Sequence, residues 1–249
     1  MEIVNNLNIF IVYHDKIFPE NYIKDILFDL NLYTFLKVGD NEKEDDSHHV
    51  HLKQLETYIP LGKHYAEAEA IYNIYKNPEI YKNLDYIGFS QYDKPHQFRN
   101  KDGFNVTEEI LNNLAPNTHI SLESYLFEVD LAQQIMMDEA YPNQLTGYGR
   151  NAYVGILTEY NQFFKTHYSF DDLMGKEINL CSSYILPVTN WLNVMKFISE
   201  VIESKRLDKF DTERKYRLQG GLLERYFGVA IMLEGLKSIN LTIEHISQK

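Results

Sequence analysis

An acidic residue and a histidine follow an apolar run and have a spacing that suits metal binding. Residues 86–91 form the apolar run, Asp93 follows it, Pro95 stops a strand, and His96 comes next. Ligands of α/β proteins sit at the carboxyl ends of strands. A carboxylate and an imidazole placed there could hold a divalent metal against a phosphate. The alternative is that Asp93 only begins a turn.

A second group of polar residues follows the first apolar segment. Residues 7–13 are predicted to form a buried strand, residues 19–30 a helix, and residues 33–38 a second strand. This βαβ order predicts a parallel pair of strands. Tyr13, His14 and Asp15 would then lie where a base and a ribose dock, although a surface turn is an equal alternative.

The clearest helix covers residues 64–77. Lys63 precedes it and could reach a phosphate, helped by the partial positive charge of the helix N-terminus; an ordinary surface lysine is the alternative. Glu67 and Glu69 are two positions apart and cannot share one helix face, so at most one should point into a site.

The remaining pattern predicts a single α/β domain with a mixed sheet, parallel in its first half and less regular in its second. The further strands are expected at 85–91, 118–122, 125–127 and 178–186, with a strand or tail at 238–246. The further helices are expected at 105–114, 129–139, 152–164, 191–204 (capped by Thr189 and Asn190) and 218–233.

Two other groups of metal-binding or nucleophilic residue types have plain interpretations. Residues 41–51 are polar and acidic and include His48, His49 and His51, which could bind a metal, but an exposed loop is favoured. Cys181 lies in a strand-like run and is interpreted as a small core residue rather than a nucleophile.

Composition narrows the class of protein. The 249 residues are 44% hydrophobic, which supports a substantial core, and the formal net charge of -12 argues against nucleic-acid and anionic-membrane binding. One cysteine allows no intrachain disulfide and fits a reducing compartment. Without a long apolar run or a basic leader, a soluble cytoplasmic protein with no transmembrane segment is expected.

Five short segments occur in a characteristic order along the chain: 10–15, 38–39, 63–77, 87–92 and 220–225. Their order and spacing resemble the small glycosyltransferase domain of bacterial capsular-polysaccharide clusters, often filed as a domain of unknown function. The chain is also similar to glycosyltransferase domains of large algal and amoebal DNA viruses. The resemblance extends from about residue 8 to residue 235.

The resemblance implies a GT-A-like, Rossmann-type mixed sheet flanked by helices. One domain, 1–249, would combine a nucleotide-sugar half (about 7–122) with an acceptor half (about 123–249). The implied activity is transfer of a hexose or deoxyhexose from a nucleotide sugar to a glycan or other hydroxyl acceptor in polysaccharide biosynthesis. The viral resemblance favours retention, and inversion is the alternative. UDP is the expected nucleotide because it is frequent in such families, and Mn²⁺ or Mg²⁺ is the expected metal.

The resemblance also assigns residues. Donor-binding positions are Val12, Tyr13, His14, Val38, Gly39, Lys63, Tyr65, Glu67, Gln91 and Tyr92. On the acceptor side, Glu224 could be a general base and Arg225 could bind phosphate, beside glycines that would let a ligand approach the backbone; a Glu-Arg pair that only orders a helix is the alternative. Further positions are a closing loop, Tyr148, Gly149 and Arg150, and donor-sugar contacts, Ser182, Ser183 and Tyr184.

One segment departs from the bacterial pattern, which has His-Tyr-Arg-Arg where this chain has Gln91-Tyr92-Asp93-Lys94. Asp93 therefore takes the place of the Asp-x-Asp metal motif of GT-A enzymes, as a catalytic residue and metal ligand. Pro95 occupies the third position, so the second ligand would be His96 or a later histidine such as His167. The incomplete motif leaves open an inactive sugar-binding or scaffold domain. A nucleotidyl- or phosphotransferase is a further alternative, because fold does not fix function.

Overall fold

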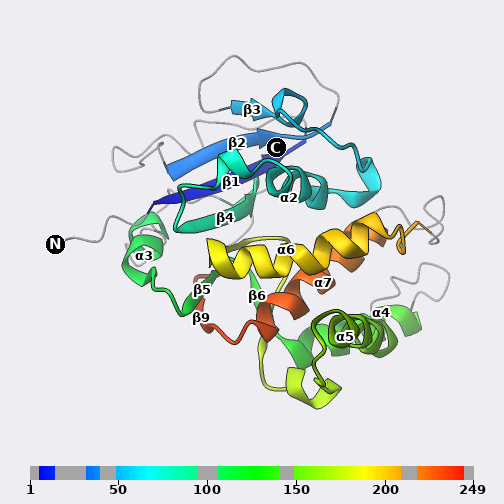
Figure 1. Ribbon diagram of the computed structural model, residues 1–249. Coiled ribbons are helices and arrows are strands. Elements are labelled where there is room, and N and C mark those ends of the chain that lie inside the picture. The colour runs from blue at the N-terminus through cyan, green and yellow to red at the C-terminus, as the bar shows by residue number, and fades with distance from the viewer. Residues whose placement is uncertain are drawn as a thin grey trace.

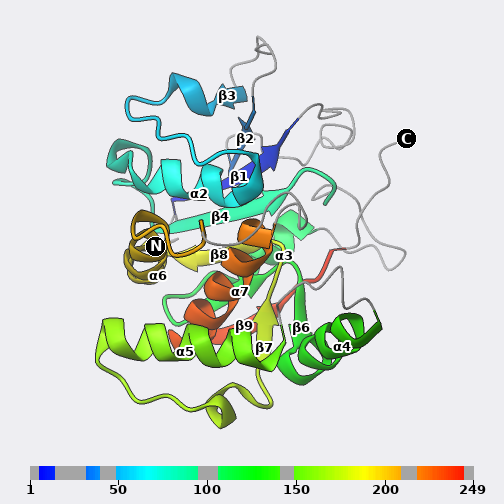
Figure 2. The same cartoon turned by 90° about the vertical axis from the view of Figure 1, so that its right-hand side faces the viewer.

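The computed structural model describes residues 6–14, 32–39, 49–94, 106–140, 149–208 and 218–243. Their centre is a seven-stranded mixed sheet in the order β3-β2-β1-β4-β8-β5-β9. A two-stranded sheet, β6-β7, lies beside it. Figures 1 and 2 both show β1, β2, β3 and α2 at one end of the molecule and α4 and α5 at the other.

The strands are β1 (Leu7–Tyr13), β2 (Tyr33–Lys37), β3 (His49–His51), β4 (Tyr86–Gln91), β5 (Thr118–Ser121), β6 (Ser124–Leu126), β7 (Glu177–Asn179), β8 (Tyr184–Pro187) and β9 (Lys237–Asn240). The α-helices are α2 (Glu67–Tyr75), α3 (Val106–Asn113), α4 (Phe127–Ala140), α5 (Arg150–Phe164), α6 (Val188–Glu203) and α7 (Leu218–Leu233). Short 3₁₀ helices are η2 (Leu52–Gln54), η3 (Lys63–Tyr65), η4 (Pro78–Ile80) and η5 (Phe170–Leu173).

The strand directions confirm the predicted mixed sheet. β1 runs parallel to β2 and β4, and β2 runs parallel to β3. β8 is antiparallel to both of its neighbours, β4 and β5, whereas β5 and β9 are parallel. The carboxyl ends of β1, β2 and β4 therefore meet at one edge, where the polar residues named above were expected.

Alternation along the strands produces two apolar layers. Phe10, Val12 and Phe89 face one cluster together with residues of α2, α6 and α7, while Ile9 and Ile11 face a second cluster that includes residues of α3. Because successive strand residues point to opposite faces, a sheet covered on both sides needs nearly continuous apolar runs. This requirement explains why the strand predictions for residues 7–13 and 85–91 succeeded.

Three local predictions are corrected. The exposed loop expected at 41–51 is wrong for His49 and His51, which lie in β3 and are each only 9% exposed. His49 stacks on Phe35, with ring centroids 5.0 Å apart, and shares a 2.8 Å hydrogen bond with the Tyr13 hydroxyl. His48 lies outside the described residues, as does the expected helix at 19–30.

The strand expected at 178–186 is two strands in two different sheets. Cys181 and Ser182 have φ values of 55° and 47°, so the chain turns sharply between β7 and β8. The predicted cap of α6 is also wrong. The helix begins at Val188 after Pro187, and the Asn190 amide donates to Glu234 instead of capping. No helix in the described part of the chain is long and apolar enough to span a bilayer.

Candidate functional site

A cleft of about 230 Å³ opens at the carboxyl ends of β1 and β2, beside the start of α2. It is lined by His14, Val38, Gly39, Tyr58, Pro60, Gly62, Ala66 and Glu69. His14, Val38 and Gly39 are three of the positions expected to bind the donor nucleotide. The cleft therefore lies where an α/β fold places a nucleotide.

His14 and Glu67 form a polar pair next to this cleft. His14 Nε2 lies 3.3 Å from Glu67 Oε1, and the side chains are 41% and 7% exposed. Glu67 is the first residue of α2, where the helix dipole favours a negative charge. An imidazole and a carboxylate held together in this way can hydrogen-bond the hydroxyl groups of a sugar or a ribose.

Glu69 lines the cleft itself and shapes its wall. Its carboxylate accepts hydrogen bonds from the backbone N–H groups of Leu61 (3.1 Å) and Gly62 (2.7 Å), and from the Tyr58 hydroxyl (3.0 Å). The prediction that at most one of Glu67 and Glu69 points into the site is consistent with this division. Of the two residues, Glu69 lines the cleft, and it also holds the loop that forms one wall.

Two asparagines continue the same row along α2. Asn73 accepts from the backbone N–H of Ile59 (2.7 Å), and Asn77 accepts from that of Thr57 (2.9 Å). Glu69 and Asn73 are four residues apart on one face of α2, and Asn77 continues the spacing just after the C-cap Lys76. The spacing Glu-x₃-Asn-x₃-Asn is visible in the sequence, but its partners at 57–62 are not.

Replacing Glu69 by Ala is expected to lower the free energy of unfolding by about 1–3 kcal/mol, because two backbone donors lose their acceptor. The loop at 57–62 should loosen, and donor affinity should fall with it. Urea unfolding measures the first effect. The control is Glu79→Ala, since Glu79 pairs with exposed Lys82 and the change should cost little. Equal stability of the two variants would show that Glu69 does not hold the loop.

The entry to α2 has an unusual backbone. Ala66 has φ 49° and ψ -133°, a region that non-glycine residues rarely adopt. A Cβ on Gly220 would lie 3.2 Å from both Ala66 Cβ and the His64 carbonyl oxygen, so α7 packs tightly on this turn. The close approach expected at Gly220 is therefore made by the protein backbone and not by a ligand.

The other predicted donor-binding residues lie around the cleft without all facing it. Tyr13 is fully buried against His49, so stacking of its ring on a base is not seen. Val12 is 2% exposed and belongs to the core. The Tyr65 hydroxyl donates to Asp208 (2.7 Å), and Lys63 is the first residue of η3.

The turn after β4 is firmly anchored. Gln91, Tyr92 and Asp93 are partly buried there, and Lys94 is completely buried. The Tyr92 N–H donates to the Val12 carbonyl (3.1 Å), and the Lys94 N–H donates to the Gln91 carbonyl (3.1 Å). Asp93 is thus held between two residues whose backbones are fixed at the edge of the sheet.

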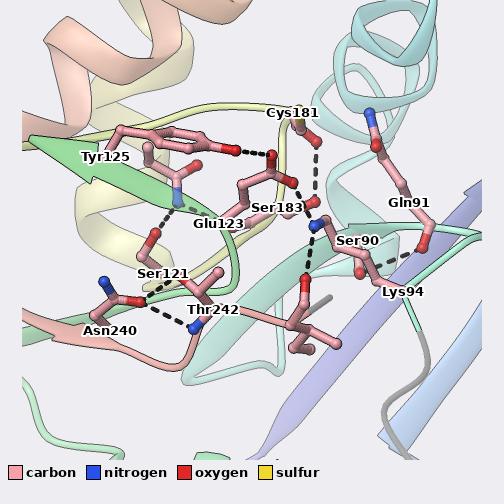
Figure 3. A network of polar contacts seen from close by, with 12 residues as sticks. Ser90, Gln91, Lys94, Ser121, Glu123, Tyr125, Cys181, Ser183, Asn240 and Thr242 are labelled. Atoms are coloured by element: carbon pink, nitrogen blue, oxygen red, sulfur yellow. Dashed lines mark hydrogen bonds and ion pairs between the residues drawn. The ribbon is translucent and has the colours of Figure 1, made fainter. Parts of the chain in front are cut away.

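Sequence reasoning missed the ion pair between Lys94 and Glu123, shown in Figure 3. The ammonium group also donates to the Ile243 carbonyl (3.2 Å), and Glu123 accepts from the Tyr125 hydroxyl (2.8 Å). Burial, and then the hydrogen bond to Glu123, raise the pKa of Tyr125 to about 12, so this hydroxyl stays protonated and donates. No periodic pattern in the sequence predicts such a pair.

On the acceptor side, Arg225 takes part in a buried ion pair. Its guanidinium lies 3.5 Å from Asp130 Oδ1 and donates to the Gly221 carbonyl (3.2 Å). Tyr153 donates to the other oxygen of Asp130 (2.6 Å). Glu224, with 19% of its side chain exposed, lies 3.4 Å from the same guanidinium. This arrangement joins α4, α5 and α7.

Cys181 lies in the turn between β7 and β8, near Glu123 and Glu224. Burial, followed by the carboxylates of Glu224 and Glu123, raises the pKa of its thiol well above the usual range. The thiol is therefore not a thiolate nucleophile at neutral pH, as the sequence indicated. Since both carboxylates act on the same thiol, the turn between β7 and β8 brings Glu224 and Glu123 into one neighbourhood.

The remaining predicted positions divide by location. Gly149 and Arg150 begin α5, and the Arg150 guanidinium lies 4.1 Å from the centroid of the Phe170 ring. Ser183 and Tyr184 are completely buried and Ser182 nearly so, so none of the three offers a surface to a donor sugar. Tyr148, Asp15 and His96 lie outside the described residues.

The described residues hold one of the expected metal ligands, Asp93, at the edge of the sheet. Within the described ranges, no three side chains of His, Cys, Asp or Glu come together in a way that could hold a metal ion. His167 lies in an exposed segment after α5. Asp93 is a candidate ligand within the described residues. A metal bound there would need further ligands, from His96 or from a bound diphosphate and water.

This sheet and its helices form a fold that a solved glycosyltransferase shares. No family model and no curated protein matches the chain. Among solved structures, it is similar to WbbM, a bifunctional glycosyltransferase, in its apo structure, with a TM-score of 0.65 and 12% sequence identity. The match covers 98% of this chain and 46% of WbbM, so the chain spans less than half of that protein. The predicted fold class is thereby confirmed, whereas the capsular and viral relationships stay predictions.

Proposed function

We propose that this protein transfers a sugar from a nucleotide sugar to a hydroxyl group of a glycan or other acceptor. The observation that carries the proposal is the cleft at the carboxyl ends of β1 and β2, bordered by His14 and the start of α2. It lies in a fold shared with a glycosyltransferase. The expected donor is a UDP-linked hexose or deoxyhexose, and the expected setting is polysaccharide biosynthesis.

Donor binding would divide between three groups. The His14–Glu67 pair would hold hydroxyl groups of the ribose, and the loop held by Glu69 would enclose the base. The first turn of α2 would face the phosphates, because Ala66 has no side-chain acceptor to cap its amide groups. Local groups of this kind are needed because the net charge of -12 does not attract a diphosphate.

Asp93 is the proposed ligand of Mn²⁺ or Mg²⁺, with His96 as the second protein ligand. Such a metal neutralises the negative charge that grows on a departing diphosphate. The chain's own contribution is to hold the Asp93 carboxylate at the edge of the sheet, through the anchored backbones of Tyr92 and Lys94.

On the acceptor side, the proposed roles depend on the stereochemistry. Transfer with retention, which is the expected outcome, leaves no need for a separate general base. Transfer with inversion would require one, and Glu224 is the proposed group, since its carboxylate is partly exposed beside Arg225. Arg225 is proposed to hold the Glu224 carboxylate in place and to bind phosphate while keeping its ion pair with Asp130.

A thermal-shift experiment with UDP-, GDP- and dTDP-sugars, each with and without Mn²⁺, tests donor binding. A ligand at one hundred times its Kd stabilises the native state by about 2.7 kcal/mol, so Tm should rise by several degrees with the UDP-sugar and Mn²⁺. UMP at the same concentration is the control for nucleotide binding alone. No shift with any sugar nucleotide would contradict the proposal.

Product analysis then separates the proposed activity from its alternatives. Glycosyl transfer releases a nucleoside diphosphate. Release of a nucleoside monophosphate or pyrophosphate would instead indicate a nucleotidyl- or phosphotransferase. Donor binding without any product would indicate an inactive sugar-binding or scaffold domain.

A further inference from the structure

We propose that Lys94 and Glu123 are positioning residues whose buried ion pair braces the turn that carries Asp93. The inference rests on the proposed function, because it concerns how the Asp93 carboxylate is held for sugar transfer. Lys94 is 0% exposed and the side chain of Glu123 is 6% exposed. Neither group therefore meets a substrate directly, so the pair acts through its neighbours.

A buried ion pair such as Lys94–Glu123 is an inefficient source of stability. Removing two charges from water carries a large desolvation cost, and apolar residues of similar volume fill such positions without loss of stability in other proteins. A buried pair is therefore weak support for a purely stabilising role. The location of Lys94, directly after Asp93, indicates a geometric one.

The contacts of Lys94 tie the turn to two other parts of the chain. Its ammonium group binds Glu123, which lies between β5 and β6, and the carbonyl of Ile243 after β9 (3.2 Å). Figure 3 shows Glu123 beside Lys94, the two residues coming from separate segments of the chain. The Lys94 backbone N–H donates to the Gln91 carbonyl (3.1 Å), so both the main chain and the side chain of Lys94 are held, and the backbone that carries Asp93 is anchored at the next residue.

Glu123 is anchored as well. Its side chain accepts from the Tyr125 hydroxyl (2.8 Å), and its carbonyl accepts from the backbone N–H of Leu180 (3.2 Å). Leu180 leads into the turn at Cys181, whose thiol lies within the electrostatic influence of Glu224. The brace therefore connects the predicted donor half, through Lys94, to the predicted acceptor half, through Glu123.

A reacting carboxylate must be held within about 0.5 Å of its productive position, and a displacement of about 1 Å can cost about 10²-fold in rate. A brace that reaches both halves supplies this precision. Its loss should lower kcat rather than raise KM for the donor, because the cleft at β1 and β2 is built from other residues.

The experiment uses the double variant Lys94→Met, Glu123→Leu. Either single change leaves an unpaired buried charge and can unfold the protein, whereas the double change keeps the volume apolar. We expect a Tm near that of the unchanged protein, kcat about 10²-fold lower, and donor KM changed less than threefold, roughly. Adding Asp93→Asn should lower the rate no further than Asp93→Asn alone, since the brace acts through Asp93.

The matched control is Lys76→Met, Glu203→Leu, which removes an ion pair between partly exposed side chains of the α2 C-cap and α6 and should leave kcat unchanged. Amide hydrogen exchange at residues 92–94 gives a second measurement that does not need activity, and we expect it to be at least about tenfold faster without the brace.

Three outcomes distinguish the brace itself, its action through Asp93, and the proposed sugar transfer. Unchanged kcat together with unchanged amide exchange in the folded double variant would overturn the brace. Additive losses from the brace and Asp93→Asn would overturn its action through Asp93. A lack of sugar transfer by the unchanged protein would overturn the proposed function instead, and amide exchange would still decide whether Lys94 and Glu123 hold the turn.

Discussion

Asp93→Asn is expected to lower the rate of sugar transfer by about 10²–10³-fold, the size of effect seen when one preorganised electrostatic group is removed from a reaction centre. Asn keeps the shape of the side chain and removes its charge. A metal held at the carboxyl end of β4 would therefore lose a charged ligand. Steady-state kinetics with a UDP-sugar over a range of Mn²⁺ concentrations measures the effect.

The matched control is Asp85→Asn. Asp85 precedes the other end of β4, and its carboxylate accepts the backbone N–H of Asn6 (2.9 Å) in an exposed position. That change should leave kcat unchanged. Full activity and unchanged Mn²⁺ dependence in Asp93→Asn would remove Asp93 from the metal site and from the catalytic residues.

Arg225→Ala is expected to lower the free energy of unfolding by about 3–5 kcal/mol, because it leaves the carboxylate of Asp130 buried without its ion-pair partner. The side chains of Arg225 and Asp130 are only 8% and 4% exposed, so water does not replace the lost partner. Urea unfolding followed by circular dichroism measures the loss.

Arg206→Ala is the control for this prediction. Arg206 pairs with Glu159 and Glu200, but 35% of its side chain is exposed, so its replacement should cost less than about 1 kcal/mol. A normal stability of Arg225→Ala together with a large loss of donor affinity would show that phosphate binding is the main role of Arg225. The measurement thus decides between the two interpretations of the Glu224-Arg225 pair in the sequence.

These two predictions concern different parts of one arrangement. Asp93 lies at the edge of the sheet and Arg225 lies in α7, and both are connected to the neighbourhood of Cys181, through Lys94 and Glu123 and through Glu224. For a variant at either position, the free energy of unfolding and the rate of sugar transfer should therefore both be measured. Loss of rate without loss of stability is expected for Asp93, and loss of stability first for Arg225.

Much of the fold could be predicted from the sequence. The apolar runs at 7–13 and 85–91 predicted buried strands, and their polar ends predicted the edge at which a cleft is found. The reason is that burial on both faces of a parallel sheet leaves a local signature in the order of residues. Helices α2, α3 and α7 were predicted as well, because the residues that favour a helix lie close together in the chain.

Other features had no local signature. The buried histidines of β3 looked like a polar loop, because partners such as Phe35 and Tyr13, which contact His49, come from other strands. The break at Cys181 was missed, because two positive φ values at non-glycine residues are imposed by the surrounding structure.

The sequence by itself determined the α/β class, the parallel first half of the sheet and the polar ends of its strands, since these depend on residues close together in the chain. The tertiary structure alone decided which charges meet: Lys94 with Glu123, Asp130 with Arg225, and Glu69 with the loop at 57–62. A buried charge is tolerated only beside its partner, and that partner is chosen by folding across long stretches of chain. The candidate site was therefore located by sequence but assembled by packing.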